Sequence, residues 1–179
     1  MSIRPIKLQS GATPTMEGAG VHLHRVFGFG DTDMFDPFLM MDDFRNDDPE
    51  QYLKGFPWHP HRGIETITYV LKGNVEHADS LGNKGVLSDG DVQWMTAGSG
   101  IIHQEMPTGN AAGQMHGFQL WANLPRDQKM CTPRYQDVKS ADIASLTDDD
   151  GTNIRVIAGD YRGYRGPVDG IDTDPIYLC

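Results

Sequence analysis

The sequence predicts an all-β protein assembled from many short strands, and three features of the chain indicate this class. Short runs rich in β-branched and aromatic residues recur along the middle of the chain, and turn-forming residues separate them. Glycine is frequent, with 21 residues, and proline contributes 11. Periodicity typical of amphipathic helices is weak throughout. A β-sandwich, barrel or jelly roll is therefore expected, and 179 residues give room for one ordinary domain.

Each expected strand lies between turn signals, as in the run 64–71, which ends at a Lys-Gly-Asn turn. The regions 10–20 and 45–55 are expected to be loops. The best candidate for a short helix is 140–146, which has an acidic residue in its first turn. The full set of expected strands is 3–8, 21–27, 38–44, 64–71, 75–80, 92–95, 101–106 and 115–122.

The charge and the apolar content exclude some classes of partner. The chain has 15 basic and 25 acidic side chains, a formal charge of −10, which opposes strong direct binding to nucleic acid. The acidic clusters at 31–48 and 148–150 are interpreted as solvated surface, because neither has the spacing of an EF-hand calcium loop. No apolar run approaches the roughly 20 residues of a membrane-spanning helix, so no membrane partner is expected.

The N-terminus and the cysteines predict where the protein resides. The first 20 residues are polar and contain no evident signal peptide. The two cysteines, Cys131 and Cys179, form no framework of paired spacings. A reduced, cytoplasmic setting is therefore expected.

Two short pairs of polar residues form the arrangement that carries chemistry. His59 and His61 are separated by one residue just before an expected strand, and in an extended chain both side chains point to the same face. His103 and Glu105 repeat this spacing in a later strand, so the two pairs can converge inside a barrel. Three imidazoles and one carboxylate would leave coordination positions open, as in a catalytic metal site. A structural polar cluster without metal is the alternative.

Three segments of the chain together resemble the pirin family of the cupin superfamily. The first is 59–70, which begins His-Pro-His-Arg-Gly-Ile-Glu. The second is 95–105, which reads Met-Thr-Ala-Gly-Ser-Gly-Ile-Ile-His-Gln-Glu, and the third is 117–125. The run 36–42 also fits, and the likeness extends over roughly residues 18–130.

The resemblance implies a cupin-type jelly-roll β-barrel, here a single domain with a short helical or irregular C-terminal segment. It also implies one metal ion held by His59, His61, His103 and Glu105. Fe(II) is the expected ion, and Mn, Ni, Cu and Zn also suit imidazole and carboxylate ligands. In many cupins the glutamate at the position of Glu65 ligates the metal, whereas the pirin pattern gives that role to Glu105.

Two further histidines, His77 and His116, lie in other expected strands. They are interpreted as core or surface residues, with a hydrogen bond to a metal ligand as the alternative. Glu65 is expected to lie beside the ligands or to be a strand residue. The pair His22 and His24 repeats the spacing of the first histidine pair without a matching His-x-Glu, and is interpreted as structural.

The chain departs from the family in its extent. Pirins carry two cupin domains, whereas residues 1–158 account for one barrel. Residues 159–179 resemble a linker and the start of a second cupin domain that is absent. Self-association as a homo-oligomer is expected to cover the face that such a domain would occupy.

The resemblance also implies a function. Some pirin-like proteins oxidise the flavonol quercetin with O2, so the chain is expected to be a quercetin or flavonol 2,3-dioxygenase whose Glu105 also accepts the proton of the substrate hydroxyl. Candidate walls of the pocket are Phe56, Trp58, Met95 and Phe118. Two alternatives stay open: a non-enzymatic, iron-dependent interaction protein of the transcriptional co-regulator type, and an inactive truncated remnant.

Overall fold

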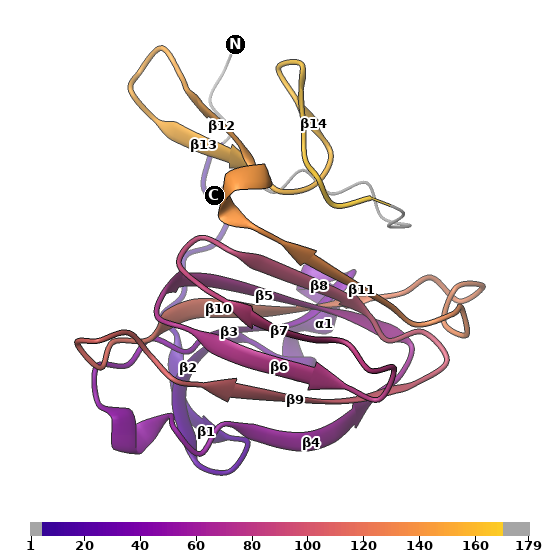
Figure 1. The fold of residues 1–179 in the computed structure, drawn as a ribbon. Coiled ribbons are helices and arrows are strands. Elements are labelled where there is room, and N and C mark those ends of the chain that lie inside the picture. The colour runs from indigo at the N-terminus through magenta and orange to yellow at the C-terminus, as the bar shows by residue number, and fades with distance from the viewer. Residues whose placement is uncertain (1–4, 170–179) are drawn as a thin grey trace.

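The computed structural model describes residues 5–169, which form two antiparallel sheets that lie face to face (Figure 1). The larger sheet has seven strands in the order β1 (Thr13–Glu17), β2 (Val21–Phe27), β3 (Phe38–Asp43), β10 (His116–Asn123), β5 (Ile64–Lys72), β8 (Val92–Thr96) and β11 (Arg134–Val138). The smaller sheet has four strands in the order β4 (Phe56–His61), β9 (Ile101–Pro107), β6 (Val75–Asp79) and β7 (Lys84–Leu87). Many neighbours in the sheets are distant in sequence, as in the expected jelly-roll barrel.

The other elements are short. Two hairpins, β12 (Ala144–Thr147) with β13 (Asn153–Val156) and β14 (Asp160–Tyr161) with β15 (Tyr164–Arg165), project from one side of the barrel in Figure 1. The helical turns are η1 (Phe29–Asp31), α1 (Thr32–Phe35), η2 (Pro49–Gln51) and η3 (Ser140–Asp142).

Strand β5 shows how alternating side chains build the layers. Ile67 and Tyr69 are buried on the outer face of the larger sheet, in a cluster that includes Ile143 from the C-terminal segments. Thr68 and Val70 are buried on the inner face, where Thr68 donates a hydrogen bond to a residue of β9. Both faces of β5 are thus covered, which explains its nearly continuous β-branched and aromatic sequence.

The apolar core has two main parts, one on each side of the larger sheet. The outer part joins Trp94 of β8 to Ile157 and Val168 of the C-terminal segments. The inner part lies between the sheets and contains Val21, Leu23, Phe44, Tyr52, Val70, Val75, Leu87 and Met115. Burial of a large apolar side chain contributes about 2–3 kcal/mol, so these clusters fix the relative positions of the strands that carry the site.

Several expected strands are confirmed, but the structure corrects the N-terminal region and the approach to the histidine pair. The N-terminal strand is β1, at Thr13–Glu17, within a segment expected to be a loop, and the described part of 3–8 is not a strand. Its polar residues gave little strand signal, and pairing with β2 orders them. His59 and His61 lie just before the expected strand, which is β5, but they also belong to a strand of their own, β4, which pairs with β9 along the edge of the smaller sheet.

The expected helix at 140–146 is wrong. Only Ser140–Asp142 forms a helical turn, and Ala144–Thr147 is strand β12, paired with β13. Burial of Ile143 and pairing with β13 outweigh the weak local preference for helix. The expected domain boundary at residue 158 stays a prediction, and the strand start expected at 175–179 lies outside the described residues.

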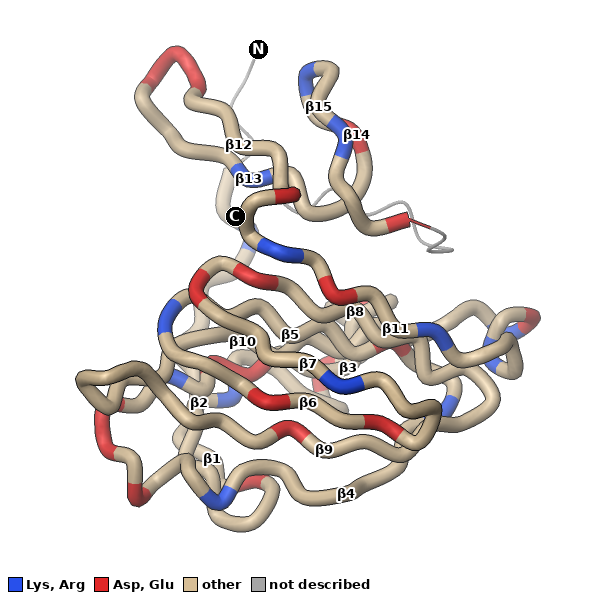
Figure 2. The backbone as a smooth tube through the Cα atoms, in the orientation of Figure 1, with Lys and Arg blue, Asp and Glu red and all other residues tan. Residues whose placement is uncertain are grey.

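Charged side chains are spread over both sheets and the hairpins (Figure 2). The acidic cluster 148–150 lies at the tip of the β12–β13 hairpin, where Asp148 pairs with Arg162. This position agrees with the solvated role expected from the sequence. Within residues 5–169, no helix has both the length and the apolar character needed to cross a membrane.

Candidate metal centre

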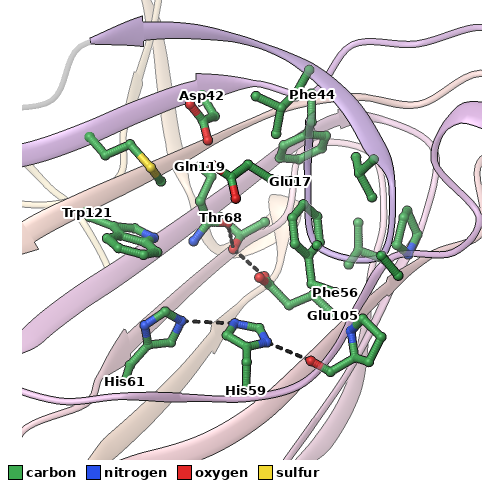
Figure 3. Close-up of a pocket in the computed structure, with 18 of the residues that line it drawn as sticks. Glu17, Asp42, Phe44, Phe56, His59, His61, Thr68, Glu105, Gln119 and Trp121 are labelled. Carbon is green, nitrogen blue, oxygen red and sulfur yellow. Dashed lines mark hydrogen bonds between the residues drawn. The ribbon is translucent and has the colours of Figure 1, made fainter. Parts of the chain in front are cut away.

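Two neighbouring strands of the smaller sheet, β4 and β9, bring three histidines together. His59 lies directly opposite His103 in the β4–β9 pairing, and His61 follows two residues after His59. The Nε2 atom of His59 is 3.0 Å from that of His61 and 2.9 Å from that of His103. Figure 3 shows His59 and His61 side by side at one wall of a cavity. The convergence expected from the two alternating pairs is therefore present for the histidines.

The protonation of these rings indicates what the cluster can hold. His59 Nδ1 donates to the carbonyl oxygen of Pro57, at 2.8 Å, which leaves its Nε2 as the nitrogen that faces the other two rings. Burial, reinforced by repulsion from neighbouring imidazoles, lowers the pKa of His61 to about 4 and that of His103 to about 3. Both rings are thus neutral near pH 7. Lone pairs that face one another repel unless a cation lies between them, so the cluster fits a metal ion.

The spacing of the nitrogens also matches a metal site. Metal–nitrogen bonds of about 2.1 Å place neighbouring ligands of a six-coordinate ion about 3.0 Å apart. The His59–His61 and His59–His103 separations have this value, and all three ligand nitrogens lie within 4.8 Å of one another. The residues present therefore fit one divalent transition metal ion, with positions left for other ligands.

Glu105, the fourth expected ligand, lies beside the histidines but outside the group of converging ligand atoms. It follows His103 by two residues on β9, is 7% exposed and lines the same cavity as His59 and His61. Its Oε1 atom accepts a hydrogen bond from Thr68 Oγ1, at 2.7 Å. The structure thus brings three of the four expected ligands to one point, and ligation by Glu105 stays a prediction.

Thr68 connects Glu105 to the larger sheet. Its Oγ1 atom also lies 2.8 Å from the side-chain amide of Gln119 on β10. The Gln119 atom in this contact is Oε1, an acceptor, so the single hydrogen of the Thr68 hydroxyl is shared between Glu105 Oε1 and Gln119 Oε1. These contacts connect Glu105 on β9 to β5 and β10 beside the histidines.

A cavity of about 810 Å³ opens beside His59 and His61. Its size is that of sites for drug-sized ligands. Its walls include the aromatic residues Phe56, Trp58 and Trp121, and the Trp121 ring lies 4.9 Å from the His61 ring. Trp58 is 54% exposed, so this wall reaches the protein surface. A planar aromatic molecule could therefore enter and lie next to the histidine cluster.

An ion cluster lies in the wall of the cavity across from the histidines (Figure 3). Arg25 donates two hydrogen bonds of 2.8 Å to the carboxylate of Asp42, which is 3% exposed, and pairs with Glu17 at 3.0 Å. The hydrogen bond to Asp42 is the main cause that raises the pKa of Arg25 further above its ordinary value. The three groups sum to one negative charge, which favours hydrogen-bond donors such as phenolic hydroxyls at this end of the cavity.

Comparison with known proteins supports the resemblance read from the sequence. The family model described as Pirin matches residues 20–122, which include the histidine cluster and most of the cavity wall. This chain belongs to the pirin family. A pirin-like protein of Caulobacter vibrioides is 47% identical over 179 residues, which cover 99% of this chain and 64% of the relative.

Two solved structures of pirin relatives are informative. A structure titled quercetin 2,3-dioxygenase from Acinetobacter baumannii has a TM-score of 0.77 and 34% identity, covering 92% of this chain and 60% of that one. A bacterial pirin from Escherichia coli, in complex with nickel(II), has a TM-score of 0.52 and 26% identity, covering 81% of this chain and 68% of that one. The chain thus spans only about two thirds of its pirin relatives.

The structure also decides the positions of the remaining expected residues. Glu65 accepts a hydrogen bond from Thr96 at 2.7 Å and lies on the opposite face of β5 from Thr68, so it does not face the histidines. His116, on β10, is outside the histidine group. His77 is buried next to His103, with ring centroids 5.4 Å apart.

Of the four residues predicted to line the pocket, two do so. Phe56 and Trp58 line the cavity, whereas Met95 belongs to a small separate core cluster and Phe118 packs on the outer face of the larger sheet. The cavity residues that sequence reasoning missed are Arg25, Asp42, Thr68, Gln119 and Trp121. Only the alternation along their strands hinted at an inward direction, and nothing local indicated that these strands share one cavity.

Proposed function

We propose that this chain is the metal-binding cupin barrel of a dioxygenase that oxidises a flavonol such as quercetin with O2. The observation that carries the proposal is the convergence of three imidazole nitrogens, from His59, His61 and His103, beside a large aromatic cavity. The 34% identity to a structure titled quercetin 2,3-dioxygenase supports the same activity.

The metal in this proposal is Fe(II), held by His59, His61 and His103 with Glu105 as the anionic ligand. Nickel(II) in the bacterial relative supports a divalent first-row ion, and imidazole with carboxylate also suits Mn, Cu or Zn. The bound ion would supply Lewis acidity that lowers the pKa of the substrate hydroxyl, together with a common binding point for substrate and O2.

The residues of the chain perform the remaining tasks. Glu105 would accept the proton of the substrate hydroxyl at Oε2 once that oxygen is no longer held by the ion, while Oε1 stays bonded to Thr68. Trp58 and Trp121 hold the planar ring system and keep bulk water from the reacting face. The carboxylates of Asp42 and Glu17, held by Arg25, accept hydrogen bonds from hydroxyl groups at the far end of the substrate.

The test begins with protein stripped of metal and reloaded anaerobically with Fe(II), or with Mn, Ni, Cu or Zn in parallel. An oxygen electrode measures the consumption of O2, and the flavonol absorbance measures the loss of quercetin at the same time. The expected result is consumption of one O2 per quercetin. With labelled O2, both oxygen atoms should appear in the organic product, because a dioxygenase needs no external reductant.

The alternatives make different predictions. An iron-dependent interaction protein, or an inactive remnant, would bind metal at full occupancy and consume no O2 with any flavonol. The cavity favours the enzyme, because an interaction protein needs no aromatic space of about 810 Å³ beside the metal. Metal-loaded protein without O2 uptake across a series of flavonols would overturn the proposal. Self-association and a cytoplasmic setting stay predictions.

A further inference from the structure

Several buried polar side-chain atoms lack hydrogen-bond partners among the residues that the structure describes. Among them are Thr66 Oγ1, both ring nitrogens of His77, Gln93 Oε1 and Nδ1 of His103. These four residues are 3% exposed or less, and none of them lines the cavity. An unsatisfied buried polar atom costs about 1–3 kcal/mol, so such a group indicates a contact or an internal water that satisfies it.

His77 lies next to the candidate ligand His103, on the neighbouring strand β6. Strand β6 pairs with β9 so that His77 lies opposite Glu105 and Asp79 lies opposite His103. The His77 and His103 rings are 5.4 Å apart at their centroids. Tyr135 stacks on His77, with centroids 4.7 Å apart and planes 18° from parallel, and so fixes the plane of the imidazole.

Asp79 determines which nitrogen of His77 carries hydrogen. Its carboxylate accepts hydrogen bonds from the backbone nitrogens of Leu81 and Asn83 and from the Asn83 side chain, at 2.8–3.0 Å, so it is ionised and held in place. Its Oδ2 lies 3.6 Å from Nε2 of His77. A neutral ring with Nε2–H toward Asp79 leaves Nδ1 as an acceptor.

The metal site requires such an acceptor. His103 can offer an Nε2 lone pair to a metal only when its hydrogen is on Nδ1, and that Nδ1–H is buried without a partner. We propose that His77 is a positioning residue of the metal centre. It accepts the Nδ1–H hydrogen bond of His103, directly or through one internal water, and so fixes the tautomer and orientation of His103.

Two variants of His77 separate this role from simple packing. His77→Phe keeps a ring that can stack on Tyr135 but cannot accept a hydrogen bond. His77→Gln loses the stacking ring but keeps an acceptor. The affinity for Zn²⁺ or Ni²⁺, measured by competition with a chromophoric chelator, needs no turnover and does not depend on the proposed activity.

The proposal predicts that His77→Phe lowers the metal affinity about 10- to 100-fold, whereas His77→Gln stays within about 3-fold of wild type. A packing role predicts the reverse order, because Gln disturbs the stacked core and Phe does not. Equal affinities for wild type and His77→Phe, or greater loss with Gln than with Phe, would overturn the proposal.

A measurement on the unaltered protein keeps the proposal testable if a variant fails to fold. In the Zn²⁺-loaded protein, ¹⁵N–¹H NMR of the histidine rings should show His103 protonated at Nδ1. That hydrogen should exchange slowly with water and have the shift of a hydrogen-bonded NH. Rapid exchange, or a His103 ring protonated at Nε2, would contradict the assigned role of His77.

Discussion

His59 of β4 and His103 of β9 are directly opposed in the smaller sheet, and their Nε2 atoms lie 2.9 Å apart. Strand β4 is the edge of that sheet and contains Pro57 and Pro60, which suit an edge because proline cannot donate to a neighbouring strand. The metal centre therefore joins an edge strand to an interior one, so metal binding and the β4–β9 pairing should stabilise each other.

Replacing a histidine of the cluster should release the metal. His59→Ala and His103→Ala each remove one of three converging nitrogens, and we expect the metal affinity to fall by more than about 100-fold, the upper range for loss of an outer partner. The matched control is His22→Ala with His24→Ala, a histidine pair of the same spacing that is exposed on β2. Elemental analysis should find full occupancy in the control, and full occupancy in His59→Ala would show that the ligand assignment is wrong.

Glu105→Gln should separate binding from catalysis. The three histidines remain, so most of the metal should stay bound, but the amide cannot accept the substrate proton. We expect O2 uptake with quercetin to fall about 10²- to 10⁴-fold, the usual contribution of a general base. Metal content and O2 uptake are measured on the same sample. Unchanged uptake at full occupancy would exclude Glu105 as the base.

The metal-free protein should lose stability as the pH falls from about 6.5 toward 4. The pKa of His61 is lowered to about 4 and that of His103 to about 3, so below pH 6.5 the unfolded chain binds protons that the folded chain does not. Each such ring lowers the free energy of unfolding by up to about 1.4 kcal/mol per pH unit. Urea titrations at several pH values give the free energy of unfolding as a function of pH. This free energy should fall less steeply with decreasing pH in His61→Gln than in wild type. The same pH dependence in both proteins would contradict the shifted pKa.

The loop from β8 to β9 should tolerate no side chain at Gly98. Gly98 has a φ of +49°, and an added Cβ would lie 2.2 Å from the carbonyl oxygen of Cys131. Gly100 also has a positive φ, but no atom lies within 4 Å of its added Cβ. Thermal unfolding should therefore show a larger loss for Gly98→Ala, above the roughly 1–2 kcal/mol of backbone strain alone, than for Gly100→Ala.

Trp121→Leu should weaken substrate binding without removing metal. The Trp121 ring forms part of the cavity wall 4.9 Å from the His61 ring, and it donates nothing to the metal. Loss of an aromatic contact of this kind is worth about 0.5–1.5 kcal/mol beyond its buried area, so flavonol affinity should fall about tenfold or more. Fluorescence quenching by quercetin in the Zn²⁺-loaded protein measures this affinity. An unchanged affinity would show that the substrate does not bind against Trp121.

Much of the site was predictable because its signal is local. His59 and His61, and likewise His103 and Glu105, are two residues apart, and the alternation of an extended chain puts each pair on one face. The same alternation argues against Glu65 as a ligand, since it lies three residues from Thr68 and so points to the other face of β5. A role for Glu65 in the strand, one of the two expected from the sequence, is the one that the structure supports.

The incorrect predictions share one cause, which is pairing between strands. Strand β1 and strand β12 are ordered by partners that no local pattern reveals, and the isolated preference at 140–146 is too weak to resist them. His77 was expected to be a core or surface histidine, with contact to a ligand as the alternative. Its position next to His103 depends on the register of β6 against β9.

By itself, the sequence determined that the protein is built from many short strands, and it predicted that two alternating pairs of side chains hold a metal, because side-chain periodicity is a property of the backbone at short range. Only the tertiary structure decided which strands are neighbours. That choice set the 2.9 Å approach of His59 to His103, the turn of Glu105 toward Thr68 and the aromatic cavity, since each depends on contacts between residues distant in sequence.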